Sequence, residues 1–300
     1  MSLPPSPTIS IVVATVDGWP AIDNAVSSFE IAASAVGGEV IIADGSGRAA
    51  PPSRALGPAT RWLRRDRESV FQLRAAGYRA AEAPIVAITE DHCRVPQDWA
   101  RRMLDAHAAH PEAVAVGGSV ANGATRNTID WASFLVVQVT QMTPIFSGPS
   151  NRLAGAVNVS YRRSVLEAID EFDGLGAMDM LHQRDLQDGG AAMIADDNIR
   201  VLHDQSLGWA GTVRIHYHAG RTFAAFVRRR MDMVGLVRLV GVLLIPYARF
   251  ARAIVIGQRK GYGAVLWRTW PLILLLYLVQ AAGQVVGFTA GPGDSPRKVR

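Results

Sequence analysis

The chain has 300 residues, 49% of them hydrophobic and 19% charged, so it can form a sizeable core and is not a disordered segment. Its one cysteine, Cys93, excludes an internal disulfide framework and fits a reducing compartment. Residues 220–300 carry thirteen Lys or Arg and two Asp (13 − 2 = +11), and the rest carries 18 basic and 24 acidic side chains (18 − 24 = −6). The basic residues flank hydrophobic runs, which favours anionic lipid headgroups over nucleic acid as the partner of this region.

The first 120 residues alternate short β-branched runs with helical patterns, which predicts a mostly parallel sheet covered by helices. Strands are expected at 9–14, 39–43, 84–88 and 113–120, and helices at 21–36, 69–81 and 97–107. Residues 49–58 are rich in Pro and Ala and are expected to form a loop.

The amino-acid composition changes after residue 220, where a predicted basic helix at 221–230 is followed by two apolar stretches. The first, 236–256, is interrupted by three arginines, which favours an amphipathic helix in the headgroup region, with a second span as the alternative. The second, 269–290, has no charged residue and is long enough to cross a hydrocarbon core of about 30 Å, although a buried core helix is the alternative. We therefore predict a globular domain at 1–220 and a membrane-associated tail at 221–300.

Polar residues follow three of the predicted strands, at the edge where open parallel sheets bind ligands. Thr15 and Asp17 follow the first strand, Asp44 the second, and Glu90-Asp91-His92 the third. A carboxylate at 44 can accept from a base or ribose, and adjacent acids at 90 and 91 can hold Mg²⁺ or Mn²⁺ against a diphosphate. Arg74, on the helix before the third strand, can reach the same phosphates. Each feature taken alone is also typical of an ordinary turn or a solvated helix start.

In this order and spacing, the motifs resemble glycosyltransferase family 2, whose members have the GT-A fold. The segment Ala14-Thr15-Val16-Asp17 stands for the opening P-T-Y-N-like motif, and Ala43-Asp44-Gly45-Ser46 for the D-D-G-S-like turn. Arg74-Ala75-Ala76-Gly77 matches the R-N-x-G helix without its asparagine, and Glu90-Asp91-His92 is a degenerate D-x-D motif with Pro96 and Trp99 after it.

The resemblance implies roles for these residues in binding a nucleotide sugar. Asp44 would read the nucleobase, Glu90 would lie by the ribose, and Asp91 would hold the metal on the diphosphate. Thr15, Asp17 and Arg74 would line the same donor site. His92 would either join Asp91 as a metal ligand or orient a phosphate or an acceptor.

The second half continues the resemblance on the acceptor side. Residues 155–163, GAVNVSYRR, look like the family's G-x-N-x-x-x-R-R strand, which places Asn158, with Trp99, beside the acceptor. The spacing of Leu186 and Gly190 places Asp179 at the family's catalytic acid, so Asp179 is the expected general base. Asp173 and Asp185 are the rival candidates, because the first acid of the family's pair is absent.

Two histidines close the predicted catalytic domain. Residues 212–218, TVRIHYH, read as a strand whose alternation places His216 and His218 on one face, as a metal pair or as structural histidines. The family often has a histidine near the donor phosphates at this point, which implies that role for His218.

These features together predict an inverting glycosyltransferase that moves a single sugar from a nucleotide diphosphate sugar to a lipid-linked or glycan acceptor. The tail would hold it on the cytoplasmic face of a bacterial inner membrane, in polysaccharide synthesis. A nucleotidyltransferase is less favoured, because residues 14–20 offer no Lys or Arg for a basic phosphate loop. A non-catalytic, nucleotide-binding membrane scaffold of the same fold remains the alternative.

Overall fold

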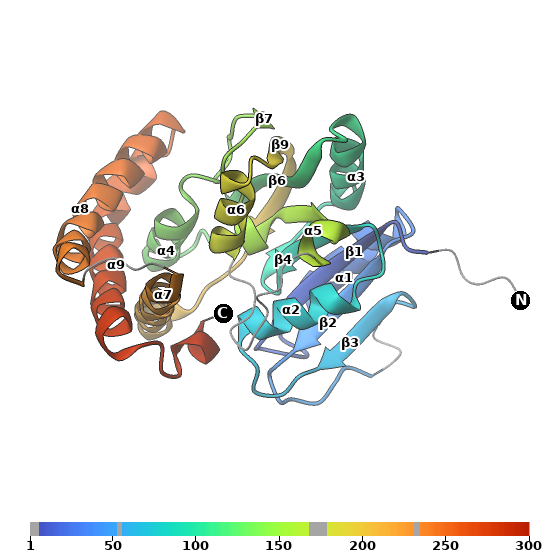
Figure 1. Ribbon diagram of the computed structural model, residues 1–300, viewed down its shortest axis with the longest axis horizontal. Helices are drawn as coiled ribbons and strands as arrows, with labels where there is room; N and C mark the ends of the chain where they lie inside the picture. The colour runs from blue at the N-terminus through green and yellow to red at the C-terminus, as the bar shows by residue number, and fades with distance from the viewer. Residues whose placement is uncertain (1–5, 53–55, 168–178, 231–234, 300) are drawn as a thin grey trace, which may run out of the picture. The chain divides into compact units, whose positions relative to one another are not determined.

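The computed structural model describes residues 6–52, 56–167, 179–230 and 235–299, with the side chains at 179–181, 229–230, 235–240 and 242–243 outside that description (Figure 1). The chain forms two compact units, one of residues 1–121 and 143–204 and the other of residues 122–142 and 205–300. The domain boundary expected at residue 220 stays a prediction. By packing, the second unit begins earlier, at 205, and also takes in a segment from the middle of the chain.

The first unit is built on a nine-stranded sheet in the order β3-β2-β1-β4-β8-β6-β9-β5, with β7 paired to β9. The strands from β3 to β4 are parallel, whereas β8 is antiparallel to both β4 and β6. Their bounds are β1 (Ile9–Thr15), β2 (Glu39–Asp44), β3 (Thr60–Arg64), β4 (Ile85–Glu90), β5 (Cys93–Arg94), β6 (Ala113–Asn122), β7 (Gly148–Pro149), β8 (Val159–Arg162) and β9 (Ala192–His203). The four strands predicted in the first 120 residues are confirmed, and β3, which is only half-buried, was missed because its sequence TRWLR is polar.

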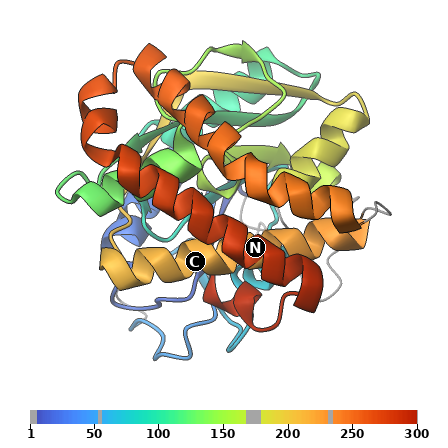
Figure 2. The ribbon, with the colours of Figure 1, turned by 90° about the vertical axis from the view of Figure 1, so that its left-hand side faces the viewer.

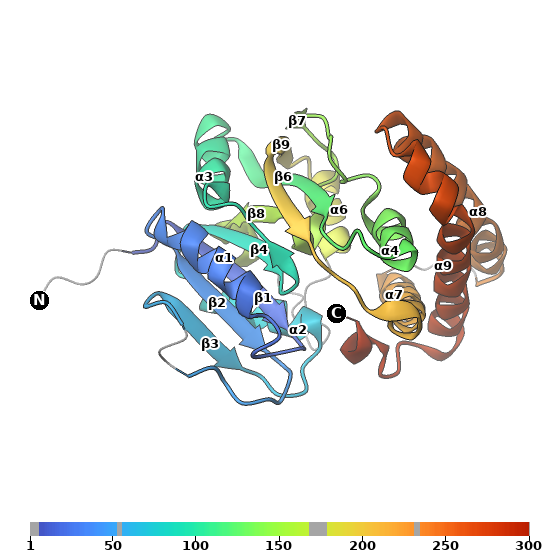
Figure 3. The same cartoon turned by 180° about the vertical axis from the view of Figure 1, so that it is seen from behind.

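Helices cover both faces of this sheet. Figure 1 shows α2 (Val70–Ala80), α5 (Arg163–Glu167) and α6 (Asp179–Asp188) on one face, and Figure 3 shows α1 (Asp23–Ser34) and α3 (Trp99–Ala109) on the other. The three helices predicted here are confirmed. Helix α2 begins where expected because Ser69 and Gln72 form a reciprocal capping box at its first turn.

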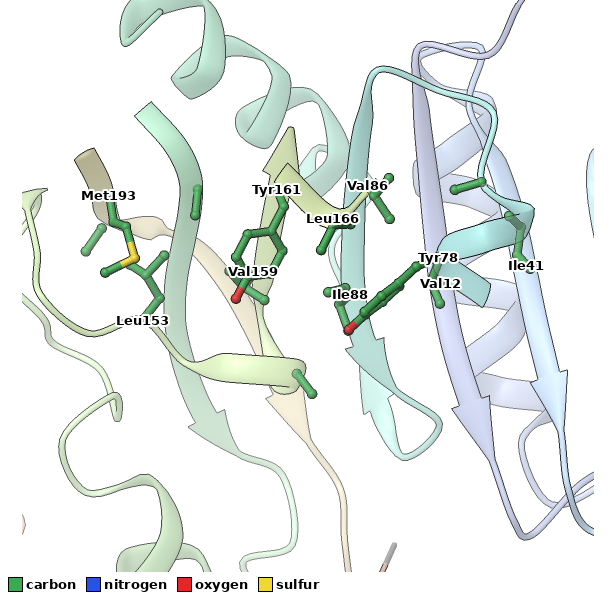
Figure 4. Close-up of a cluster of buried hydrophobic side chains, with 14 residues drawn as sticks. Val12, Ile41, Tyr78, Val86, Ile88, Leu153, Val159, Tyr161, Leu166 and Met193 are labelled. Atoms are coloured by element: carbon green, nitrogen blue, oxygen red, sulfur yellow. The ribbon is translucent and has the colours of Figure 1, made fainter. Parts of the chain in front are cut away.

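The core lies between the sheet and these helices. Every residue of β1 and β2 is buried, since both faces of these strands are covered. Figure 4 shows one cluster of this core. Within it Tyr78 lies near Val12 and Ile88, and Tyr161 lies near Val159. The central strands are therefore packed on both faces by the core.

The second unit is helical, with α4 (Thr128–Gln138), α7 (Gly208–Arg230), α8 (Gly235–Arg259), α9 (Gly263–Ala290) and the short 3-10 helix η3 (Ser295–Lys298). The strand expected at 212–218 is wrong, because these residues form the start of α7. Thr212, His216 and Gly220 are buried at intervals of four, the spacing of a helix face. Packing on this face overrides the local β-branched pattern.

A polar network ties the four long helices of the second unit together. His216 Nε2 lies 2.9 Å from Ser133 Oγ, and its Nδ1 lies 2.9 Å from the amide nitrogen of Gln280. Arg249 donates to the oxygen of the same amide at 3.1 Å, which fixes the amide so that its nitrogen donates to His216. His216 is therefore neutral and donates from Nε2 to the serine. The network takes one side chain from each helix, namely Ser133 (α4), His216 (α7), Arg249 (α8) and Gln280 (α9).

This network predicts that the second unit loses stability in acid. Burial, and then the charge of Arg249, lowers the pKa of His216 to about 4. A histidine with a lowered folded pKa stabilises the fold above its unfolded pKa of about 6.5, and this contribution, on the order of 3 kcal/mol, is lost as the pH falls toward 4. We expect urea midpoints to fall less steeply between pH 6.5 and 4 for His216→Gln than for the wild type.

The control is His110→Gln, which replaces a half-exposed histidine outside this network, at the end of α3. That variant is expected to keep the wild-type pH profile. The buried His107, whose pKa burial also lowers to about 4, adds the same acid dependence to all three proteins. Parallel profiles for wild type and His216→Gln would contradict the prediction.

Candidate functional site

The predicted polar strand ends come together at one edge of the sheet. Thr15 on β1 pairs in register with Asp44 on β2, and Ala14 pairs with Glu90 on β4. The carboxyl ends of three neighbouring parallel strands therefore lie side by side, as expected. In open sheets of this kind, this edge is where ligands bind.

Asp44 and Thr15 shape the loops at this edge. Asp44 is almost completely buried, and its carboxylate accepts from the Ser46 amide at 2.8 Å and from Trp62 Nε1 at 3.2 Å. Thr15 Oγ1 accepts from the amides of Asp17 and Gly18 at 3.2 and 3.0 Å, so it holds the turn after β1. Trp62 was not predicted, since β3 itself was missed. The nucleotide-binding roles of Thr15, Asp17 and Asp44 stay predictions.

A close group of titratable side chains lies at the end of β4. His92 Nε2 is 3.0 Å from His203 Nε2 and 3.2 Å from Glu90 Oε2, and the last two atoms are 3.6 Å apart. The rings of His92 and His203 meet edge to face, with centroids 4.5 Å apart. Two imidazole nitrogens and a carboxylate oxygen thus converge on one point.

This group fits a divalent cation. The ligand atoms of Glu90, His92 and His203 lie within 4.8 Å of one another, and among the described residues this is the cluster with a metal-ligand arrangement. Imidazole with one carboxylate suits Mn²⁺, Zn²⁺ and similar first-row cations. Asp91, the predicted metal ligand, is outside the cluster.

Asp91 instead contacts the other nitrogen of His92. Its Oδ1 lies 2.9 Å from His92 Nδ1, which leaves Nε2 aimed at Glu90 and His203. A carboxylate behind a histidine in this way fixes the ring and its tautomer when the front nitrogen binds a metal. The structure therefore favours Asp91 as a residue that positions His92, while its role as a direct ligand stays a prediction.

His203 was missed because it lies more than a hundred residues from Glu90 in the chain. It is the last residue of β9 and pairs with Cys93 of β5, directly after His92. A further hydrogen bond of 2.9 Å joins the amide of Asp204 to the carbonyl of His92. The antiparallel pairing of β5 and β9 thus brings His203 into the cluster. No local sequence motif predicts this position of His203.

The cluster is charged even without a metal. Burial lowers the pKa of His92, but hydrogen bonds with Asp91 and Glu90 outweigh burial and raise that pKa to about 10. Burial raises the pKa of Glu90, yet hydrogen bonds with both histidines and the charge of Arg74 hold it well below its usual range. Burial and the neighbouring His92 lower the pKa of His203. In the absence of a metal, the proton on His92 therefore lies where the ligand atoms of Glu90, His92 and His203 converge. A metal cation would replace this proton.

Arg74 also lies at this edge, beside Glu90, and its predicted role toward a diphosphate stays a prediction. It lies on α2, is almost completely buried, and its Nη2 donates to Glu90 Oε1 at 3.0 Å. Glu90 consequently uses one oxygen for Arg74 and turns the other toward the histidines. A guanidinium so placed contributes positive charge at the end of β4, where a diphosphate would need it.

Trp99 and Asn158 lie inside the fold. Both are completely buried, and Trp99 Nε1 donates to Asn158 Oδ1 at 2.9 Å. The Asn158 amide donates to the carbonyls of Ser119 and Ile199 at 2.9 and 2.8 Å, so it joins β6 to β9. At Gly118 a Cβ would lie 1.6 Å from the Ile199 oxygen, so only glycine allows this approach. These contacts favour a structural role, and contact with an acceptor stays a prediction.

The remaining predicted residues are less defined. Asp179 is the first residue of α6, but its side chain lies outside the described residues, as does the whole of Asp173. The rival Asp185 is exposed on α6. His218 lies on α7 in the second unit, where its Nδ1 is 2.9 Å from Ser295 Oγ. On a helix, positions 216 and 218 point in different directions, so the shared face expected from a strand is wrong.

Comparison with known proteins supports the fold assignment. No protein-family profile matches the chain, and no curated protein matches it. Among solved structures, the chain is similar to the mannosyltransferase PcManGT from Pyrobaculum calidifontis, in complex with GDP-Man and Mn²⁺. The TM-score is 0.58 at 17% sequence identity, over 93% of this chain and 87% of that chain. The predicted glycosyltransferase-type α/β fold, with an apolar C-terminal helix, is thereby confirmed.

Proposed function

We propose that this protein is a glycosyltransferase that uses a nucleotide diphosphate sugar and a divalent cation. The observation that carries the proposal is the convergence of Glu90, His92 and His203 at the end of β4, beside Arg74. This cluster lies at the ligand-binding edge of a fold shared with a protein solved with GDP-Man and Mn²⁺.

The positions of these residues suggest a different role for each in binding the cation and the donor. Glu90, His92 and His203 would hold the cation, Asp91 would orient His92, and Arg74 would add charge toward the phosphates. When bound, the cation stabilises the negative charge that develops on the leaving diphosphate. The turns built by Thr15 and Asp44 lie beside this point and would bound the nucleoside.

The finer features of the proposal rest on the resemblance to family 2. They are transfer of one sugar with inversion, Asp179 as the general base, and His218 near the donor phosphates. The acceptor would be a lipid-linked or surface glycan, and the enzyme would act at the cytoplasmic face of a bacterial membrane. GDP-mannose is the first donor to test, because the similar mannosyltransferase was solved with it.

Isothermal titration of GDP, UDP and dTDP with and without Mn²⁺ tests the proposal. We expect one nucleotide to bind only with Mn²⁺, and this binding to be lost in Glu90→Gln, which removes the negative charge of one ligand. Glu112→Gln, at an exposed glutamate of the same unit, is the matched control and is expected to bind as the wild type does.

Metal-dependent hydrolysis of the matching nucleotide sugar then distinguishes an enzyme from a scaffold. Binding without any turnover, even with acceptor present, would support the scaffold alternative. If no nucleotide binds under either condition, the transferase proposal is wrong.

A further inference from the structure

The exposed apolar side chains of this protein are concentrated on two helices. Among the described residues, ten of the twelve large hydrophobic side chains that stand exposed belong to the second unit, and eight of the twelve lie on α8 or α9. They are Leu244, Ile245, Tyr247 and Val255 on α8 and Trp267, Trp270, Leu275 and Leu278 on α9. Such a concentration marks an interaction surface, whereas single exposed apolar residues are ordinary.

On α9 these side chains form a continuous stripe. The exposed positions recur at helical intervals from the first turn to the last: 264, 267, 271, 275, 278, 282 and 289. The opposite face is buried and includes polar residues, among them Thr269, Gln280 and Gln284. By length and composition α9 is also the one described helix that could cross a bilayer. What each face of α9 contacts distinguishes a helix that crosses the membrane from one that lies on its surface.

The buried face of α9 packs closely on the polar helix α7. A Cβ at Gly283 would lie 2.1 Å from the Tyr217 carbonyl oxygen, and one at Gly220 would lie 2.1 Å from the Gln280 oxygen. Arg214 of α7 lines a groove together with Val279 and Ala282 of α9. A bilayer around the middle of α9 would therefore also surround this arginine and the His216 network, which is costly at that depth.

The charges beside the stripe indicate the partner. Helices α8 and α9, which lie side by side in Figure 2, contain no Asp or Glu. Arg252 and Arg259 on α8 and Arg268 on α9 are exposed next to the apolar residues. An exposed apolar face with tryptophans and flanking arginines is the pattern of a helix that lies in the membrane interface.

We propose that α8 and α9 attach the protein to one leaflet of an anionic membrane, with α9 lying in the membrane plane and not crossing it. Trp267, Leu275 and Leu278 enter the acyl boundary, the exposed arginines meet anionic headgroups, and α7 stays on the aqueous side. The inference does not depend on the proposed transferase activity.

Vesicle flotation of the full chain tests the surface. The wild type is expected to float with vesicles of phosphatidylcholine and phosphatidylglycerol, to float less with pure phosphatidylcholine, and to be released by carbonate at pH 11. The double variant Leu275→Asp/Leu278→Asp should weaken flotation at least about tenfold, because it removes two leucines from the exposed stripe that enters the membrane. Ile31→Asp, at an exposed aliphatic position of α1, is the matched control and should float as the wild type does.

Cysteine labelling tests the orientation. Cys93 is completely buried, so Gly263→Cys and Ala290→Cys place reactive thiols at exposed positions at the two ends of α9, outside the stripe. In vesicle-bound protein, an impermeant maleimide added outside is expected to label both. Labelling of one end alone, together with resistance to carbonate, would establish a spanning helix and overturn the proposal. Normal flotation of the double variant would also overturn the proposal. If that variant is then a monomer and the wild type a dimer, the stripe is a contact between two copies of the chain.

Nucleotide binding by the same preparations separates the two proposals. The double variant is expected to keep the wild-type response to nucleotide and Mn²⁺. If no protein binds nucleotide but flotation behaves as described, the transferase proposal fails and the membrane surface stands.

Discussion

Replacing His203 by alanine is expected to lower the affinity for Mn²⁺ more than ~100-fold, beyond the ~10–100-fold cost of losing a group that only orients a ligand. The reason is that His203 Nε2 is one of three atoms that converge at the end of β4. Mn²⁺ binding followed by electron paramagnetic resonance measures the change directly, without nucleotide or activity.

Asp91→Asn separates a positioning residue from a ligand. Its amide can still contact His92 Nδ1, so the three ligand atoms stay in place, and a loss of only ~10–100-fold is expected. His110→Ala, at an exposed histidine of the same unit, should not change Mn²⁺ binding. Should Asp91→Asn cost as much as His203→Ala, Asp91 is itself a ligand, as the sequence motif predicted.

Replacing Asn158 by leucine is expected to destabilise the first unit by about 3–5 kcal/mol, a large part of the ~5–15 kcal/mol that holds a typical domain. Leucine has a similar volume, so the loss comes from hydrogen bonds and not from a cavity. Three buried groups lose their partner: Trp99 Nε1 and the carbonyls of Ser119 and Ile199. The free energy of unfolding, measured in urea, reports the change.

Asn198→Leu is the matched control, because Asn198 lies exposed on β9 and its hydrogen bonds within the described residues are local ones to Asp196. A surface change of this kind is expected to cost no more than ~0.5 kcal/mol. A loss below 1 kcal/mol for Asn158→Leu would contradict the structural role. Normal stability with lost acceptor use would restore the role that the sequence resemblance implied.

Much of the first unit could be predicted from the sequence, because its information is local. The central strands are runs of residues such as ISIVVAT, whose continuous apolar character requires burial on both faces. Parallel strands covered by helices place their carboxyl ends together, so Thr15, Asp44 and Glu90 were correctly expected at one edge. The start of α2 is likewise set locally, by the capping box of Ser69 and Gln72.

The predictions that failed required information from distant parts of the chain. TVRIHYH alternates like a strand, yet it is helical because Thr212, His216 and Gly220 pack inside the second unit. The structural contacts of Asn158 with β6 and β9 also depend on distant residues, while its acceptor role stays a prediction. A short pattern cannot show which of these packing partners will be present.

The sequence by itself determined the fold class, the polar strand ends and the basic, apolar C-terminal region, because periodicity, burial and charge are properties of short segments. Only the tertiary structure decided the composition of the cluster, in which β5 and β9 bring His203 to His92 and leave Asp91 behind the ring. It also decided which face of α9 is covered by α7 and which is left exposed. Both depend on contacts between residues far apart in the chain, and the identity of such partners is a property of the folded molecule.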